Sequence, residues 1–543
     1  MDFTGELAGA IGKRVSIRLR EGDSMRDLLG VLQSENELIK RDGSVATFSP
    51  SDIAFFRIVP VFNRRDQQRD LQEITLQLYE SASRQLRDIS SDVVRIYSCG
   101  PTVYRDAHVG NMRTFLLTDL IKRFAEYQGL KVELIQNITD VGHMADDTGL
   151  GGVDEGQADT EDRIIAQSKT ESSDALSIAR KYEDNFHRDL GLLNIKKATK
   201  YPRASESIEL MIELIQKLID KKHAYVGPEG TVYFDSKSYP SYGQISGNKL
   251  EQLQPGYRFD GKSDPNKKFH ADWSLWKNAG ESRTQLTWET PWGRGYPGWH
   301  IECSAMSLKF LGTKIDIHTG GIDLRFPHHE DERAQSNAAV DTEVVNHWVH
   351  GEHLLFEGRK MSKSSGNVLL VSDVIEKGLD PLAIRLSLLE HRYRSQMDLT
   401  WNSITASHKN LNRIREKMQE YSSFKGSVEQ NYLKQFEIAL TEDLDTNKVL
   451  QLLRTLEKDE NVSPGDKYQT IAKFDEVLGL DLTRAPEKTP DLVITPEIKE
   501  LLEKRIKARE DKNWQLSDEL RNQLAGLGIG VKDSAQGQEV VPL

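Results

Sequence analysis

The sequence predicts an α/β protein that contains a parallel-sheet domain with an insertion, a C-terminal helical domain and a small N-terminal β-barrel. A β-type run at residues 93–99, a Gly-Pro turn, a helical pattern at 108–127 and a β-type start at 132–135 follow one another, as in a βαβ unit. From about residue 404 onward, charged amphipathic segments of helical period dominate. Near the start, residues 14–20 alternate with period two, which indicates a half-buried strand.

The sequence predicts a small β unit for the N-terminal segment, residues 1–63, and indicates no function for it. Turn signals at 22–23 and 42–43 divide it into short strands, so we expect a barrel, which loosely resembles the Sm-like or SH3-like barrels. It contains no chemical motif. Residues 64–92 are expected to form a polar linker and the lead-in to the next domain.

Length and composition favour a multidomain protein of the cytoplasm. At roughly 150 residues per domain, 543 residues suggest three to four domains. Only two cysteines occur, which argues against a disulfide scaffold. The start lacks a basic and apolar leader, and no apolar run approaches the about 18 residues of a membrane span. A net charge of -12 disfavours a nonspecific polyanion binder without excluding a local basic surface.

The βαβ unit opens a Rossmann-like domain that we assign to residues 93–403. A parallel sheet of this kind binds ligands beyond the carboxyl ends of its strands, where Cys99 and His108 are expected. A helical pattern at 205–222, followed by strands and turns, predicts an inserted subdomain at about 200–290. The acidic, Gly-rich stretch 142–162 is expected to be a mobile, solvated loop rather than a cation site.

The C-terminal part divides into a helical domain, 404–490, and a small terminal unit, 491–543. The helical pattern breaks at residues 463–466 and again at Pro486, Pro490 and Pro496. Proline and glycine end helices because they remove a donor or release the backbone.

The tetrapeptide His108-Val109-Gly110-Asn111 lies where the strand turns into the helix. Amides at a helix start favour phosphate, and Gly110 permits its close approach. Taken alone, the motif is equally compatible with a capping role for His108.

The second motif is the polar loop 360–367, which carries Lys360 and Lys363. Two ammonium groups beside small hydroxyl residues can offset the charge on a departing pyrophosphate; a solvated basic turn is the alternative. No Gly-x-x-x-x-Gly-Lys pattern offers a competing site. Together the two motifs, about 250 residues apart, resemble the paired signatures of class I aminoacyl-tRNA synthetases.

These motifs, with the segments 98–104, 297–306 and 326–330, resemble cysteinyl-tRNA synthetase over roughly residues 75–543. A single free cysteine is ordinarily a small buried apolar group. The resemblance instead implies one zinc ion per chain, held by Cys99, Cys303, His328 and Glu332. His328 and Glu332 are four residues apart and would share a helical face.

A metal of this kind suits the choice between cysteine and serine. A pocket of ordinary shape rejects a near-isostere by no more than about 100-fold. Zinc lowers the pKa of the substrate thiol and bonds its thiolate, a soft ligand that a hydroxyl cannot match. We therefore predict a metal for substrate recognition rather than for water activation, and no editing domain.

The resemblance also implies the remaining site residues. Gly100, Thr139, Trp299 and His318 would line the cysteine pocket, although plain core packing for Trp299 and a turn cap for Thr139 remain open. ATP, with Mg²⁺, would contact His108, Gly110, Asn111 and Lys363. Catalysis would come from alignment and electrostatics, with His108, Asn111, Lys360 and Lys363 as the catalytic groups.

Two features depart from the family pattern and indicate a divergent branch. The acidic loop follows residues 137–140 where the family usually continues with two acidic residues and a lysine, and it leaves His143 either a surface residue or a substrate contact. The N-terminal barrel is the second departure, because the family usually begins close to Cys99.

The C-terminal end combines basic residues with an aromatic one: Arg505, Arg509, Trp514 and Arg521. Unstacked RNA bases are bound by aromatic and Arg contacts, and the resemblance favours this role over an amphipathic helix with a buried Trp514.

The sequence thus predicts ATP-dependent attachment of L-cysteine to tRNA(Cys) through a cysteinyl-adenylate, by a monomer with no membrane partner. Two alternatives remain. One is a cysteine ligase acting on an amino sugar, whose family shares the adenylating core but lacks the tRNA-reading end. The other is a noncatalytic RNA-binding relative.

Overall fold

The structure is a computed structural model, and it forms two compact units, Met1–Glu73 and Ile74–Leu543, which are described separately. The residues it describes are 7, 9–21, 24–40, 44–58, 75–142, 162–253, 264–361, 366–486, 495–527, 529–534 and 537–542. Among these residues, no helix is long and apolar enough to cross a membrane.

The N-terminal unit is a five-stranded antiparallel sheet in the order β4-β3-β2-β1-β5. Val15, Ile17 and Leu19 alternate along β1 and face the core, which confirms the period-two strand expected at 14–20. Closure of this sheet into a barrel stays a prediction. The strands are β1 (Arg14–Glu21), β2 (Ser24–Ser34), β3 (Glu37–Lys40), β4 (Val45–Thr47) and β5 (Ile53–Ile58).

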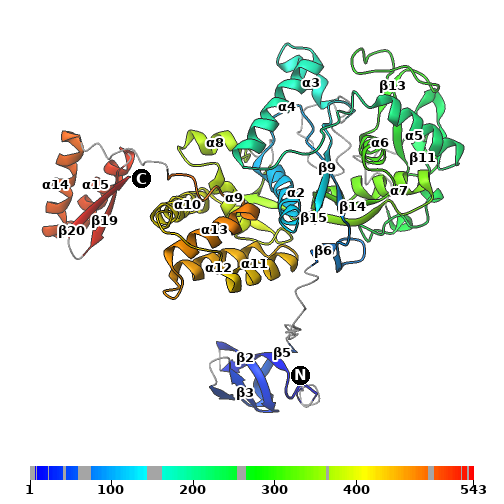
Figure 1. Cartoon of the computed structure of the whole chain (residues 1–543). Coiled ribbons are helices and arrows are strands. Elements are labelled where there is room, and N and C mark those ends of the chain that lie inside the picture. The colour runs from blue at the N-terminus through cyan, green and yellow to red at the C-terminus, as the bar shows by residue number, and fades with distance from the viewer. Residues whose placement is uncertain are drawn as a thin grey trace. The chain divides into compact units, whose positions relative to one another are not determined.

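The larger unit is built around a four-stranded parallel sheet in the order β15-β14-β8-β9. Its strands are β8 (Val93–Ser98), β9 (Lys131–Gln136), β14 (Ile315–Gly321) and β15 (Val345–Gly351). Helix α2 (Val109–Tyr127) joins β8 to β9 (Figure 1), as the sequence predicts. All four strands end at one edge, where parallel sheets bind ligands.

Side-chain alternation along β8 assigns its residues to two cores. Val94 and Ile96 pack with α2 in one core, whereas Tyr97 and Cys99 pack in the other with α6 (Trp299–Leu311) and α7 (His328–Val340). Successive residues of a strand point to opposite faces. Cys99, the first residue after β8, is therefore directed to the α6 and α7 side of the sheet.

The segment between β9 and β14 carries helices and an antiparallel sheet of order β10-β11-β12-β13. Helix α5 (Ile208–Asp220) occupies the region where the sequence shows helical periodicity. The sheet leads through its last strand directly into α6, which carries Cys303. The other elements are α3 (Arg163–Thr170), α4 (Ala175–Leu192), β10 (Ala224–Val226), β11 (Val232–Phe234), β12 (Trp273–Asn278) and β13 (Gly295–Pro297).

Helices dominate the chain from α10 onward, as the sequence predicts from about residue 404. The Ser463 side chain caps α13 and Pro464 is its first residue, which explains the predicted break in the helical pattern. The proposed domain bounds themselves stay predictions. The elements after β15 are β16 (Leu354–Phe356), β17 (Arg359–Lys360), α8 (Val371–Glu376), α9 (Leu382–Leu389), β18 (Met397–Leu399), α10 (Trp401–Tyr421), α11 (Gln430–Thr441), α12 (Thr446–Lys458), α13 (Pro464–Leu478), α14 (Pro496–Glu510), α15 (Trp514–Gly526), β19 (Ile529–Ser534) and β20 (Gly537–Pro542), with the hairpin β6 (Gln77–Glu80) and β7 (Gln85–Asp88) preceding β8.

A buried ion pair fastens the helical segment to α2. Asp119 of α2 accepts a 2.6 Å hydrogen bond from the Arg385 guanidinium and a 2.8 Å bond from Arg123, and the side chains of Asp119 and Arg385 are fully buried. Arg385 also donates to the Leu478 carbonyl at the end of α13. Because α2 begins at the His108 motif, this contact anchors the helix that carries the predicted phosphate site.

We expect Asp119→Asn to lower the free energy of unfolding by about 3 kcal/mol, since removing one partner leaves a buried guanidinium uncompensated. Urea unfolding followed by tryptophan fluorescence measures this loss. The matched control is Glu126→Gln on the same helix, whose partner Lys196 is half-exposed; it should cost less than about 1 kcal/mol. Equal losses for the two variants would contradict a special role for the buried pair.

Candidate functional site

A cavity of about 290 Å³ opens at the carboxyl ends of the parallel strands. Gly100 lies at its base, where a Cβ atom would come within 1.7 Å of the Asn137 carbonyl oxygen. Only glycine fits this close approach of the segments that follow β8 and β9. The predicted site residues that line the cavity are Cys99, Gly100, His108, Gly110, Asn111, Thr139, Trp299, Cys303, His328 and Lys360.

The four predicted metal ligands come together, and three of them, Cys99, Cys303 and His328, line the cavity. The Sγ atoms of Cys99 and Cys303 are 3.9 Å apart. Cys99 Sγ lies 3.5 Å from Oε1 of Glu332, and His328 Nε2 lies 3.0 Å from the same oxygen. All four side chains are buried, and their potential ligand atoms lie within 4.8 Å of one another.

These separations fit a tetrahedral zinc ion. With zinc bonds of about 2.3 Å to sulfur and about 2.0–2.1 Å to nitrogen or oxygen, the edges of a tetrahedron are about 3.8 Å between sulfurs and about 3.3 Å between nitrogen and oxygen. The observed 3.9 Å and 3.0 Å lie close to these values. Two thiols, one imidazole and one carboxylate are also a donor set that zinc accepts.

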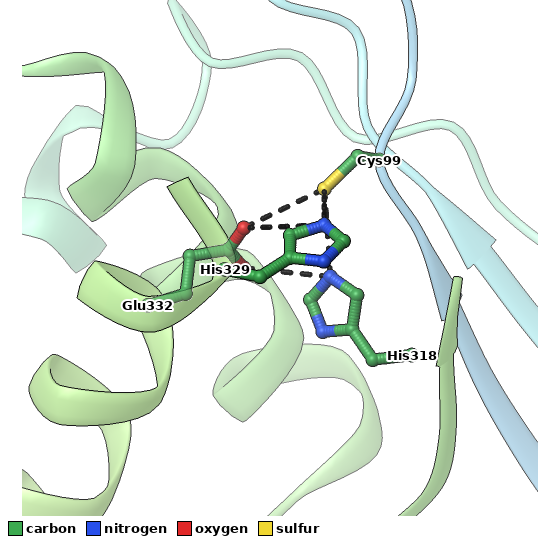
Figure 2. Close-up of side chains that lie close together, drawn as sticks. All are labelled: Cys99, His318, His329 and Glu332. Carbon is green, nitrogen blue, oxygen red and sulfur yellow. Dashed lines mark hydrogen bonds and ion pairs between the residues drawn. The ribbon is translucent and has the colours of Figure 1, made fainter. Parts of the chain in front are cut away.

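A second, overlapping group shares Cys99 and Glu332 but uses His318 and His329 (Figure 2). Cys99 Sγ lies 3.4 Å from His318 Nε2 and 3.3 Å from His329 Nε2. His318 is fully buried, contacts Glu332, and is absent from the described cavity lining. The structure therefore places this predicted pocket residue among the buried ligand candidates behind the cavity wall.

The groups of the cluster shift one another's pKa. Burial opposes charging of His328, but Glu332 and Cys303 raise its pKa to about 10. Burial and the neighbouring Cys303 raise the pKa of the Cys99 thiol, so that it donates to Cys303. The four potential ligand atoms surround one shared position, and ligands of these types bind a metal ion in their deprotonated forms.

The start of α2 has the features of a phosphate site. The His108 ring accepts a hydrogen bond from the Asn111 amide at 3.3 Å and so caps the helix. Burial, with Arg105 and Lys360 nearby, lowers the His108 pKa to about 4, so the ring is neutral near pH 7. His108 therefore both caps the helix and lines the cavity. At Gly110, a Cβ would come within 2.9 Å of the His108 ring.

Several predicted residues fall outside the part of the chain that the structure describes. These are Lys363, His143 and most of the acidic loop, because residues 143–161 and 362–365 are not described. Lys360 and Met361, immediately before the second gap, line the cavity. The lysine loop is therefore connected to the cavity through its first residues.

Two pocket residues have partners that the sequence did not predict. Thr139 donates a 3.0 Å hydrogen bond to Glu302, which is fully buried, and Asn137 donates to Thr139 at 3.1 Å. Trp299 is half-buried and packs 4.2 Å, centroid to centroid, from the His328 ring. Asn137, Glu302 and His329 were missed, although each adjoins or lies within a segment that carries the family resemblance.

The C-terminal unit corrects one predicted RNA contact. Arg505 is buried, and its guanidinium donates to Asp533 and Gln538, so it holds the β19–β20 hairpin to α14 rather than facing a ligand. Trp514, by contrast, is 56% exposed and stacks with Arg509 at 5.4 Å. Arg521 is also exposed.

Two family models match the chain. The tRNA synthetases class I (C) catalytic domain matches residues 85–147 and 155–409, and the Cysteinyl-tRNA ligase anticodon binding domain matches residues 490–540.

Curated relatives match over most of their length. A cysteine–tRNA ligase of Thermus thermophilus is 38% identical over 465 residues, which cover 82% of this chain and 94% of the relative. That of Brachyspira hyodysenteriae is 36% identical over 482 residues, covering 84% and 98%. The Agrobacterium radiobacter K84 agnB2 LeuRS–tRNA–LeuAMS complex has a similar fold, with a TM-score of 0.52 and 11% identity, covering 72% of this chain and 84% of that one.

Proposed function

Because the chain belongs to the cysteinyl-tRNA ligase family, we propose that Cys99, Cys303, His328 and Glu332 hold the zinc ion with which it selects cysteine. The protein is a class I aminoacyl-tRNA synthetase, a cysteine–tRNA ligase that uses ATP and tRNA. The observation that carries the zinc proposal is the tetrahedral spacing of these four buried ligand atoms.

When bound, zinc would supply a Lewis acid that favours the substrate thiolate over a serine hydroxyl. The choice of His328 rather than His329 is supported by the cavity, since His328 and both cysteines line it. A ligand set open to the cavity can receive the substrate sulfur. In our proposal, His318 and His329 do not bind the zinc ion but lie buried beside its four ligands.

We assign the phosphates of ATP, with Mg²⁺, to the start of α2. The neutral His108 ring and the amides of the first turn are donors there, and Gly110 permits their approach. Lys360 and Lys363 would offset the charge on the departing pyrophosphate. The chain's own residues thus align the amino-acid carboxylate with the α-phosphate, and no side chain acts as a covalent nucleophile.

The anticodon end comprises in our proposal Arg509, Trp514 and Arg521. The match over residues 490–540 and the exposure of Trp514 support it, because an exposed aromatic ring stacks on unpaired bases. The same match disfavours an amino-sugar ligase, which lacks this end. A cytoplasmic location, a monomeric state and the absence of a membrane partner stay predictions, as does the divergent-branch assignment.

Metal analysis combined with amino-acid activation tests the proposal. We expect about one zinc per chain and cysteine-dependent exchange between ATP and pyrophosphate, with serine activated far more than 100-fold less well, beyond what pocket shape alone achieves. Transfer to tRNA(Cys) should follow. Fully active protein without metal would contradict the zinc proposal, and failure to form adenylate despite bound zinc would favour a noncatalytic relative.

A further inference from the structure

Glu302 is a buried carboxyl group beside the substrate cavity, and it has no cationic partner among the residues that the structure describes. It lies on α6 next to Cys303 and is fully buried. One oxygen, Oε2, accepts the hydrogen bond from Thr139, whereas Oε1 has no hydrogen-bond partner among the described residues. Leaving a buried polar atom unpaired costs free energy, so this arrangement needs an explanation.

The directions of the first two hydrogen bonds of this network follow from one backbone amide. The Gly100 N–H can only donate, and it donates to Oδ1 of Asn137 at 2.9 Å. The other end of Asn137 is therefore its NH₂ group, which donates to Thr139 Oγ1. The Thr139 hydroxyl donates its single hydrogen to Oε2 of Glu302, which can accept it even though burial raises the pKa of this acid.

This network leaves Thr139 with one remaining acceptor site. A hydroxyl has one hydrogen and two lone pairs; Glu302 takes the hydrogen and Asn137 takes one lone pair. Thr139 and Asn137 both line the cavity. The free lone pair can accept a hydrogen bond from an N–H or O–H group in the cavity. It cannot donate one to a ligand oxygen.

The amino-acid substrate brings a donor of the right kind. Its α-ammonium carries three N–H groups and a positive charge, and the same cavity contains the two cysteines that would hold the thiolate through zinc. The neighbouring carboxylates Asp140 and Asp162 are already paired with Arg180 and Arg283. Among the described residues, Glu302 is the buried acid at this wall that forms no ion pair.

We propose that Glu302 is a positioning residue for amino-acid recognition, which holds the Thr139 hydroxyl so that it accepts a hydrogen bond from the α-ammonium of cysteine. The inference rests on the proposed cysteine–zinc site. It assigns to Glu302 a role that depends on the ammonium of the substrate and not on its thiol.

Binding measurements on Glu302→Gln test this role with two ligands. L-cysteine has the ammonium, whereas 3-mercaptopropionate keeps the thiol and carboxylate but lacks it. A Gln side chain can donate to Thr139 and so reverse the hydroxyl. We expect the Kd for cysteine to rise about 10- to 100-fold, the range for a hydrogen bond to a charged group. The Kd for 3-mercaptopropionate and the zinc content should stay unchanged.

Thr139 variants provide the matched control. Thr139→Ser keeps the hydroxyl and should bind cysteine nearly as the natural protein does, whereas Thr139→Val should show the loss expected for Glu302→Gln. Because Glu302 acts through Thr139, the double variant should be little worse than either single one. If Glu302→Gln fails to fold, the test is the comparison of Thr139→Ser with Thr139→Val, using the Kd for cysteine and for 3-mercaptopropionate.

Three results would overturn the inference. They are an equal loss for cysteine and 3-mercaptopropionate, an unchanged Kd for cysteine, and additive losses in the double variant. Each would make Glu302 a merely structural group. Failure of the underlying zinc proposal looks different: the natural protein would then contain no zinc, or Cys303→Ser would keep its zinc, whatever Glu302→Gln does to the two Kd values.

Discussion

Cys303→Ser is expected to lose the zinc ion and to reduce kcat/KM for cysteine activation by at least about 1000-fold. The thiolate of Cys303 supplies one of two soft ligands, and its Sγ lies 3.9 Å from that of Cys99. A serine hydroxyl does not replace a thiolate at zinc. Without the metal, selection depends on pocket shape, so preference for cysteine over serine should fall below about 100-fold. Metal content and ATP–pyrophosphate exchange with both amino acids measure these effects.

Ser307→Ala is the matched control for Cys303→Ser. Ser307 is buried on the same helix, and its hydroxyl donates to the Ser304 carbonyl within that helix. This variant should keep its zinc and its preference for cysteine. If Cys303→Ser retained full zinc and selectivity, the cluster of Cys99, His318, His329 and Glu332 would become the metal site instead.

Lys363→Ala is expected to slow adenylate formation about 100- to 1000-fold while changing the Kd for cysteine less than about twofold. Removing one donor that stabilises charge in the transition state costs about 2.7–4 kcal/mol. The loop begins at Lys360 and Met361 on the cavity wall, on the side where Arg105 and His108 lie. Single-turnover measurement of adenylate formation, together with cysteine binding at equilibrium, separates the two quantities.

Lys458→Ala on α12 removes an exposed ammonium group that does not line the catalytic cavity. It should leave adenylate formation unchanged. A parallel loss of catalysis and cysteine binding in Lys363→Ala would contradict the pyrophosphate role and favour a general role in substrate binding.

Much of the buried cluster of cysteine, histidine and glutamate side chains could be predicted because its residues lie in short segments that carry the family resemblance. The spacing of His328 and Glu332 already places them on one helical face. His329, the next residue, was missed. Because its helix is buried on all sides, both histidines lie in the protein interior, where either could contact the cluster. All but one of the residues of α7 are buried, and no pattern in its sequence separates the two.

The C-terminal end shows where the same reasoning fails. Arg505, Arg509 and Trp514 fall within one basic and aromatic cluster, and the sequence treats them alike. Asp533 pairs with both Arg505 and Arg509, but only Arg505 is buried, where Gln538 is a second partner from more than two dozen residues downstream. A buried arginine needs such partners, and their position depends on how the chain returns.

By itself, the sequence predicted the βαβ unit from residue type and local spacing, and its resemblance to a known family predicted the two phosphate motifs and the four zinc ligands. Only the tertiary structure decided which neighbours each group has. It brought Glu302 to Thr139 across 163 residues, and directed that hydroxyl through Asn137 and the Gly100 amide. The physical reason is that a hydrogen bond has a donor and an acceptor side, and packing between distant elements fixes which side faces the substrate.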